Sequence, residues 1–252
     1  MKYLLLTAIG VGGSTIIGAL IGFLFKKPSH KLGDYITSFA AGVMLCAAIV
    51  GLILPSMEQG TDLWTIIITT VGIFLGAYAL NLIDKIIPHL HKVTGVSENL
   101  SSEKSSGLDK ILLFVIAIGI HNLPEGIAAG VSFGGEISRA ITVSGGIALQ
   151  NIPEGMVIIA PLIAAGVSKR RTFLIALATG LIEVVGTFMG YFAISISTAI
   201  LPFALAFAGG TMLYVISDEM IPETHSHGNE RGATYSLLAG FVLMLIFDFI
   251  MR

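Results

Sequence analysis

Two hexapeptides with nearly the same sequence carry the side chains best suited to chemistry. HNLPEG occupies residues 121–126, and QNIPEG occupies residues 150–155. Residues three and four apart lie on one face of a helix, so His121, Asn122 and Glu125 project together if the first hexapeptide is helical. An imidazole, an amide and a carboxylate on one face could together bind a divalent metal ion.

The second hexapeptide repeats this spacing, and a third acid joins the set. Gln150, Asn151 and Glu154 repeat the first spacing, and Glu183 stands alone in the apolar stretch TGLIEVVG. No Lys or Arg lies in these stretches to neutralise the acids. A charged side chain in the middle of a bilayer costs on the order of 2.5–3.5 kcal/mol, so three uncompensated carboxylates call for a visiting cation.

The types of ligand indicate which cation this is. Imidazole nitrogen with carboxylate and amide oxygens suits Zn²⁺, Fe²⁺, Mn²⁺ and similar divalent ions, whereas a filter for alkali ions would more often use backbone carbonyls. One or two divalent ions would remove most of the charge of three carboxylates, so we expect a site for one or two metal ions. Because ligands bind metal in deprotonated form, metal binding should release protons from the glutamates.

Both hexapeptides also contain a proline that weakens its helix. Pro124 and Pro153 cannot donate an N–H to the carbonyl four residues back, so a kink is expected at each. Freed backbone at membrane depth is tolerated where it is buried in protein or lines a wet cavity, as at a transport site. The alternative is a hydrogen-bonded network that only fixes helix register, but the duplicated motif and the central acid favour the metal site.

The elements that position these residues are membrane-spanning helices. The chain is 54% hydrophobic and only 12% charged, which leaves too little polar surface for a soluble protein of 252 residues. The apolar runs are continuous rather than alternating, which excludes a β-barrel and predicts an all-α integral membrane protein. A crossing takes about 20 helical residues. We predict eight spans: 3–25, 34–56, 63–83, 111–132, 140–166, 172–197, 200–221 and 234–251.

Basic residues predict the orientation of this single transmembrane domain, 1–252. Eleven of the fourteen Lys and Arg lie in connections 26–33, 84–110, 167–171 and 222–233. The positive-inside rule therefore places these connections in the cytoplasm and both termini outside, in the plasma or inner membrane. The Ser-rich, charged segment at 85–110 is predicted to be a mobile cytoplasmic loop.

Several other classes of protein are disfavoured. Net charge is −2 and no basic stripe is interleaved with aromatics, which argues against nucleic acid as a partner. The single Cys46 cannot form an intramolecular disulfide. GVSFG at 130–134 matches a hydrolase motif but falls at a helix end, and the zinc-protease pattern HExxH is absent. We therefore predict no enzymatic activity, and keep an intramembrane hydrolase as a distant alternative to a transporter, behind a metal-sensing or proton-conducting membrane protein.

At these residues the sequence resembles the ZIP (Zrt-, Irt-like protein) family of divalent-metal transporters, and most closely its GufA-like branch. The resemblance rests on the two hexapeptides, Glu183, SDEMIPETHSHG at 217–228 and eight spans. It implies uptake of zinc, with Fe²⁺, Mn²⁺ and Cd²⁺ as alternatives, into the cytoplasm through a binuclear site in the middle of the bilayer, formed by spans four, five and six. It further implies a homodimer in the lipid bilayer and an inverted repeat of spans one to three and six to eight.

The resemblance also implies two metal positions that share the glutamates of both hexapeptides. The first position would be held by His121, Glu125, Gln150 and Glu154. The second would be held by Asn122, Asn151 and Glu183 together with Glu125 and Glu154. Many family members have His in place of Gln150, and some have Asp in place of Asn151, so the neutral amides here lower the charge of the site.

Polar residues near both ends of the spans could serve the ion's path. At the outer end of span two, Glu58 and Asp62 could attract cations, and Met44 resembles a methionine that lines the pathway in the family. On the inner side, acids and histidines could accept an emerging ion, although ordinary solvated positions are the alternative. These relay candidates are His89, His91, Asp218, Glu219, Glu223, His225 and His227. Asp248, in span eight, has no assigned role.

Overall fold

The structure is a computed structural model that describes residues 1–25, 29–86, 107–164 and 166–251, and within these ranges it contains helices and no strand. The α-helices are α1 (Lys2–Gly22), α2 (His30–Cys46), α3 (Leu54–Met57), α4 (Leu63–Ile86), α5 (Gly107–Val131), α6 (Ile137–Ala164), α7 (Lys169–Ile196), α8 (Leu201–Val215), α9 (Ile221–Thr224) and α10 (Glu230–Met251). The all-α fold class is confirmed. Most of the predicted loop at 85–110 falls on 87–106, outside the described residues.

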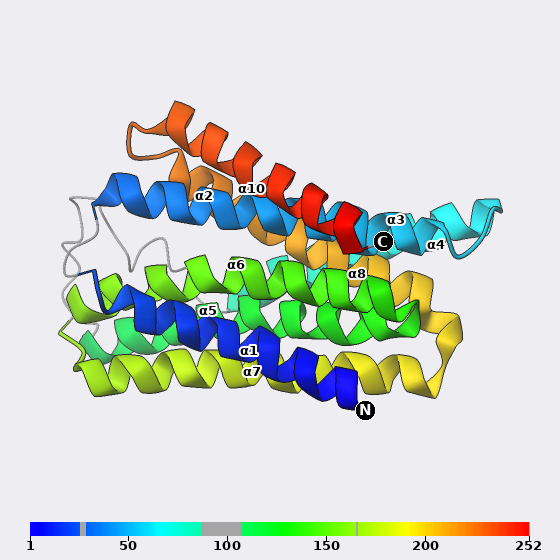
Figure 1. The fold of residues 1–252 in the computed structure, drawn as a ribbon, viewed down its shortest axis with the longest axis horizontal. Helices are drawn as coiled ribbons and strands as arrows, with labels where there is room; N and C mark the ends of the chain where they lie inside the picture. The colour runs from blue at the N-terminus through cyan, green and yellow to red at the C-terminus, as the bar shows by residue number, and fades with distance from the viewer. Residues whose placement is uncertain (26–28, 87–106, 165, 252) are drawn as a thin grey trace.

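The long helices lie roughly parallel to the long axis of the molecule, as expected of a multi-span membrane protein (Figure 1). Within the described ranges, seven helical stretches are long and apolar enough to cross a membrane, and α5 adds a helix of 25 residues beside them. Both chain termini lie at one end of the bundle, which we call the terminal end. The opposite end carries the start of α2, the start of α7 and the connection from α9 to α10.

Two of the crossings contain a π-helical turn. Ala47–Ile53 joins α2 to α3, and Ile216–Met220 joins α8 to α9. In both cases a proline, Pro55 or Pro222, is the second residue of the short helix that follows. A proline has no N–H for the carbonyl four residues back, and a π turn is one way to accommodate that missing bond. Spans two and seven, which the predicted inverted repeat would pair, thus share one local pattern.

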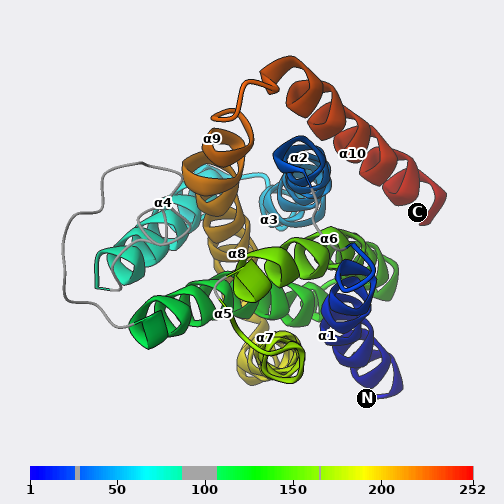
Figure 2. The same ribbon diagram turned by 90° about the vertical axis from the view of Figure 1, so that its left-hand side faces the viewer.

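The helices form two groups. In the first group, α1 packs along α6 and α7, and α5 packs along α7; in the second, α4 packs along α8 and α10 along α2. Figure 2 shows the two groups as separate halves of the molecule, with α3 and α9 in the second. The main contacts between the groups are those of α2 with α6 and of α5 with α8.

Glycines permit the close helix contacts inside each group. A Cβ atom added to Gly126 or Gly130 of α5 would collide with the carbonyl oxygen of Glu183 or Thr187 on α7. Equivalent backbone contacts occur at Gly18 and Gly155 between α1 and α6, at Gly42 and Gly240 between α2 and α10, and at Gly76 and Gly210 between α4 and α8. Transmembrane helices with small residues at such positions approach closely enough for extensive van der Waals packing.

We predict that Gly130→Ala destabilises the protein, because the added methyl group meets the α7 backbone, which cannot move aside as a flexible side chain would. Overpacking of this kind costs typically about 1–3 kcal/mol. Thermal unfolding of the purified protein in detergent measures the loss. Gly13→Ala is the matched control, since its Cβ would have no neighbour within 4 Å. Equal melting temperatures for the two variants would contradict the proposed packing.

Candidate metal site

The two hexapeptides face each other across the interior of the first group. HNLPEG lies within α5 and QNIPEG within α6, and both helices run on through their prolines without a break. Glu125 and Gln150 are buried, and the Gln150 Nε2 group donates a hydrogen bond to Glu125 Oε1 at 2.8 Å. This bond joins residues 25 positions apart in sequence at one depth of the bundle.

Glu183 of α7 lies where four helices meet. Its side chain has no solvent exposure, and its carboxylate accepts three hydrogen bonds from three other helices. The donors are the Thr15 hydroxyl of α1 at 2.6 Å, the Asn151 amide of α6 at 2.5 Å and the Asn122 amide of α5. Sequence reasoning missed Thr15, because one hydroxyl in an apolar span looks like any other that bonds to its own helix.

The three acids influence one another electrostatically. When ionised, the Glu125 carboxylate is repelled by the charges of Glu154 and Glu183, while Glu154 lies within electrostatic range of the His121 imidazole. Glu154 is half-buried, whereas Glu125 and Glu183 are fully buried. Concentrated negative charge of this kind in a dry interior favours the binding of a cation.

Three oxygen atoms in this region have no hydrogen-bond donor. Across the described residues, buried side-chain atoms without a partner include Glu125 Oε2, Gln150 Oε1 and Asn151 Oδ1, and the remaining ones are hydroxyl groups elsewhere. The two amides use their nitrogen ends to bond to carboxylates, which leaves their oxygen ends unpaired. Buried polar atoms are nearly always paired, and oxygens that accept but cannot donate suit a positively charged partner.

The site is not closed around a single point in this conformation. Over the described ranges, no three side chains of His, Cys, Asp or Glu converge so as to hold one ion. Amide nitrogens occupy the positions around the carboxylates that cations would take. An amide can turn its oxygen instead of its nitrogen toward the centre, so Asn122, Gln150 and Asn151 could complete the ligand set after rotation.

His121 contacts an acid of the second group. Its Nε2 atom lies 3.0 Å from Glu219 Oε1, and the two side chains are 22% and 19% exposed. Glu219 lies in the π-helical turn between α8 and α9, so the pair bridges the two helix groups. The sequence suggested Glu219 as a relay residue on the inner side, and the structure places it in contact with His121.

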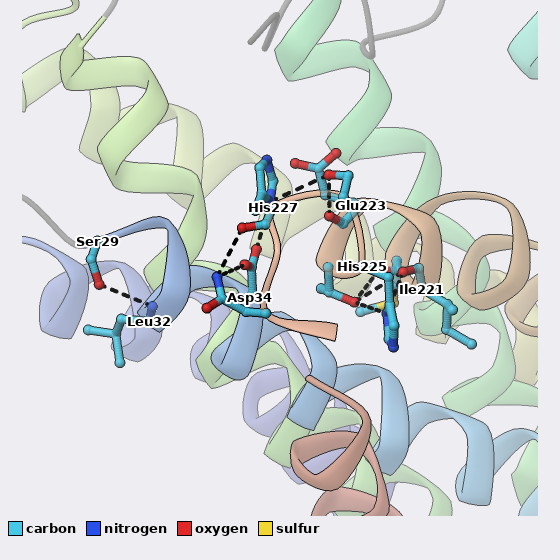
Figure 3. A network of polar contacts seen from close by, with 11 residues as sticks. Ser29, Leu32, Asp34, Ile221, Glu223, His225 and His227 are labelled. Atoms are coloured by element: carbon cyan, nitrogen blue, oxygen red, sulfur yellow. Dashed lines mark hydrogen bonds and ion pairs between the residues drawn. The ribbon is translucent and has the colours of Figure 1, made fainter. Parts of the chain in front are cut away.

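The other relay candidates among the described residues have different surroundings. Asp218 and Glu223 are exposed, and Figure 3 shows His225 and His227 at separate places in the connection that follows α9. His225 Nδ1 lies 2.8 Å from the carbonyl oxygen of Ile221, a local contact at the end of α9. His89 and His91 lie outside the described residues.

His227 instead fastens the α9–α10 connection to α2. Its Nδ1 lies 2.9 Å from Oδ1 of Asp34, whose second oxygen accepts a hydrogen bond from the Asn229 amide at 3.2 Å (Figure 3). Asp34 is only 4% exposed, and no pattern in the sequence predicted a buried acid at the start of α2. The three residues tie the α9–α10 connection to α2.

The entrance candidates have different surroundings. Met44 is fully buried in the main hydrophobic core. Asp62 caps α4, because its Oδ1 accepts hydrogen bonds from the Thr65 hydroxyl at 2.7 Å and the Thr65 N–H at 3.0 Å, and these bonds lower the pKa of Asp62 below its usual value. Glu58 forms an ion pair with Arg139, whose Nη1 lies 2.6 Å from Glu58 Oε2.

Comparison with known proteins identifies the family to which the chain is similar. Residues 102–248, which include both hexapeptides and Glu183, match the family described as ZIP Zinc transporter. The zinc transporter GufA of Myxococcus xanthus is 40% identical over 97% of each chain. The zinc transporter ZIPB of Bordetella bronchiseptica is 34% identical over 93% of this chain and 77% of its own. The human zinc transporter ZIP11 is 30% identical over 94% of this chain and 93% of its own.

We predict that Thr15→Val destabilises the protein by about 1–3 kcal/mol, because it removes a donor from a fully buried carboxylate without changing side-chain size. Thermal unfolding in detergent at neutral pH measures the effect. Thr187→Val is the matched control, since the Thr187 hydroxyl is equally buried but donates only to the backbone carbonyl of Glu183 in its own helix. If both substitutions cost the same, Thr15 does not hold Glu183.

Proposed function

The chain belongs to the ZIP family of zinc transporters, and we propose that it carries Zn²⁺ into the cytoplasm through the buried site formed by α5, α6 and α7. It is a multi-pass membrane protein that transports divalent metal ions and is not an enzyme. Fe²⁺, Mn²⁺ and Cd²⁺ are the alternative cargoes that the same ligand types would accept.

The observation that carries the proposal is the set of unpaired oxygens beside the acids. Glu125 Oε2, Gln150 Oε1 and Asn151 Oδ1 are buried without a donor, next to carboxylates whose charges repel. A divalent cation would give all three oxygens a partner and reduce the repulsion at the same time. The alternative, a hydrogen-bonded network that only fixes helix register, would supply neutral donors and would not reduce the repulsion between ionised glutamates.

We propose two metal positions bridged by Glu125 and Glu154. His121 and Gln150 would complete the first position, and Asn122, Asn151 and Glu183 would complete the second. Support comes from the hydrogen bonds: each amide already touches a carboxylate of its proposed position, Gln150 with Glu125 and both asparagines with Glu183. Binding of the ion would turn each amide so that its oxygen replaces its N–H group toward the centre.

The exposure of the site residues supports an inward-open state. His121 and Glu219 are partly exposed, and Glu219 lies in the turn that leads into α9, whose connection to α10 lies at the opposite end of the bundle. Toward the terminal end, buried apolar residues cover the site: Val143 packs on Gly51, and Met244 and Ala47 pack on Gly146. We therefore propose that the opposite end faces the cytoplasm of the plasma or inner membrane, with both termini outside.

The division into two helix groups supports a way to alternate access. Every residue of the two proposed metal positions lies in the first group, while Glu219 belongs to the second. Movement of the first group against the second would break the His121–Glu219 contact and could open the covered side. We further propose that Glu219 accepts the departing ion, followed by the exposed Asp218 and Glu223, and that the protein works as a homodimer.

We predict that proteoliposomes containing the intact chain take up Zn²⁺ with saturation, and that Glu125→Gln and Glu154→Gln each reduce uptake by at least about 100-fold. Removal of a metal ligand costs this much because no other group at that place can bind the ion. Both substitutions keep side-chain size. Ser195→Ala, at an exposed hydroxyl that bonds to its own helix, is the control. Uptake at the wild-type rate by both glutamine variants would refute the proposed site.

We predict that Glu219→Gln lowers turnover by about tenfold and changes KM for Zn²⁺ much less, because it removes the acid that would receive the ion during release. Initial rates over a range of Zn²⁺ concentrations separate the two quantities. Glu230→Gln, an exposed acid at the start of α10, serves as the control. A rise in KM with unchanged turnover would instead place Glu219 in uptake from the other side.

A further inference from the structure

Arg139 forms a contact between the two helix groups at the terminal end. It lies in the first turn of α6, and its guanidinium reaches Glu58, the residue that directly follows α3. The side chains are 42% and 56% exposed. An ion pair this exposed contributes little to folding stability, so stability does not explain why a lone arginine stands at this place.

A small cavity connects Arg139 with a second acid. The cavity has a volume of about 20 Å³, and its lining includes Arg139, the Thr142 hydroxyl-bearing side chain and Asp248 of α10. A volume of this size accommodates about one water molecule, and its walls are polar enough to hold one. Arg139 thus stands at a place where the second group supplies two carboxylates, Glu58 and Asp248.

The cavity lies on the helix face that leads to the proposed metal site. Arg139, Val143, Gly146 and Gln150 follow one another at intervals of four, three and four residues, so they share one face of α6. At a rise of about 1.5 Å per residue, Arg139 is roughly 16 Å from Gln150 along the helix. Val143 also lines the cavity, and it is fully buried at the level where the path is covered.

The charges at this point favour divalent over monovalent cations. The guanidinium already supplies one positive charge to Glu58 and stands beside the cavity that Asp248 lines. A monovalent ion that displaced it would restore only the charge that was lost. A divalent ion carries twice the charge and is attracted more strongly to a place that two carboxylates line, and Thr142 could add an oxygen ligand, since its hydroxyl donates to the backbone carbonyl of Ser138 and keeps its lone pairs.

We propose that Arg139 is a tethered counter-ion for Glu58 and Asp248, which an incoming divalent cation must displace before it can reach the metal site. Arg139 is then a residue that sets specificity rather than a ligand. This inference rests on the proposed function, because it requires that ions enter from the terminal end. It adds a selective step about three helical turns before the site itself.

The test is Zn²⁺ uptake by proteoliposomes that contain Arg139→Gln, measured at several concentrations of Zn²⁺ and of KCl. Removal of the competing charge should lower KM for Zn²⁺ by about three- to tenfold, with turnover within about twofold of the wild type. It should also make uptake more sensitive to inhibition by K⁺, because K⁺ then competes with Zn²⁺ for Glu58 and Asp248 without the Arg139 charge beside them. Arg139→Lys should retain most of the wild-type behaviour, because it keeps the charge.

Arg170→Gln, which removes a positive charge at the start of α7 on the opposite end, controls for a general effect of net charge. Unchanged melting temperatures show that each variant is folded. An unchanged or raised KM for Arg139→Gln, or a fall in turnover alone, would overturn the role of Arg139. If the wild-type protein itself takes up no Zn²⁺, the proposed function fails; if it does and Arg139→Gln behaves identically, only this inference fails.

Discussion

A fully buried carboxylate, that of Glu183, determines how the first helix group is put together. An acid removed from water is tolerated only when donors surround it, and here α1, α5 and α6 each send one donor to the same side chain. These helices must therefore approach α7 or one another closely. The glycine contacts at Gly126 and Gly155, one turn from the donors, allow that approach. The hydrogen bonds to Glu183 thus depend on the close helix packing that Gly126 and Gly155 allow.

Hydropathy and spacing sufficed to predict the spans and the facing hexapeptides, because both are properties of short stretches of sequence. The fold class and the family followed from them. The contributions of Thr15, Asp34 and Glu219 could not be predicted in this way. Each depends on a partner far away in the chain, at separations of 168 residues for Thr15 with Glu183 and 193 for Asp34 with His227. Asp62 differs from these three because its partner is local. The sequence suggested it as an entrance residue, and in the structure its carboxylate accepts a hydrogen bond from Thr65, three residues further along the chain.

Two ion pairs among the described residues join the helix groups, one toward each end of the bundle. His121 meets Glu219 on the side toward the opposite end, and Arg139 meets Glu58 at the terminal end. In both pairs the basic residue belongs to the group that holds the site and the acid belongs to the other group. The interior between the groups is otherwise mainly apolar and contains fully buried Ala47, Val143 and Met244. Charged contacts at the ends and apolar contacts between them suit surfaces that separate and meet again.

The π-helical turns before Pro55 and Pro222 give spans two and seven a built-in adjustment. A π turn contains about one residue more than an α turn, because its hydrogen bonds join residues five apart instead of four. If the π turn moves along the helix, the residues it passes change their register while the helix stays folded. A shift of the register by one residue rotates a side chain about the helix axis by about 100° and moves it along the axis by about 1.5 Å. Glu58 lies just beyond one such turn, and Glu219 lies within the other. A register shift of one residue would therefore change the direction in which Glu58 and Glu219 point, while spans two and seven remain continuous helices.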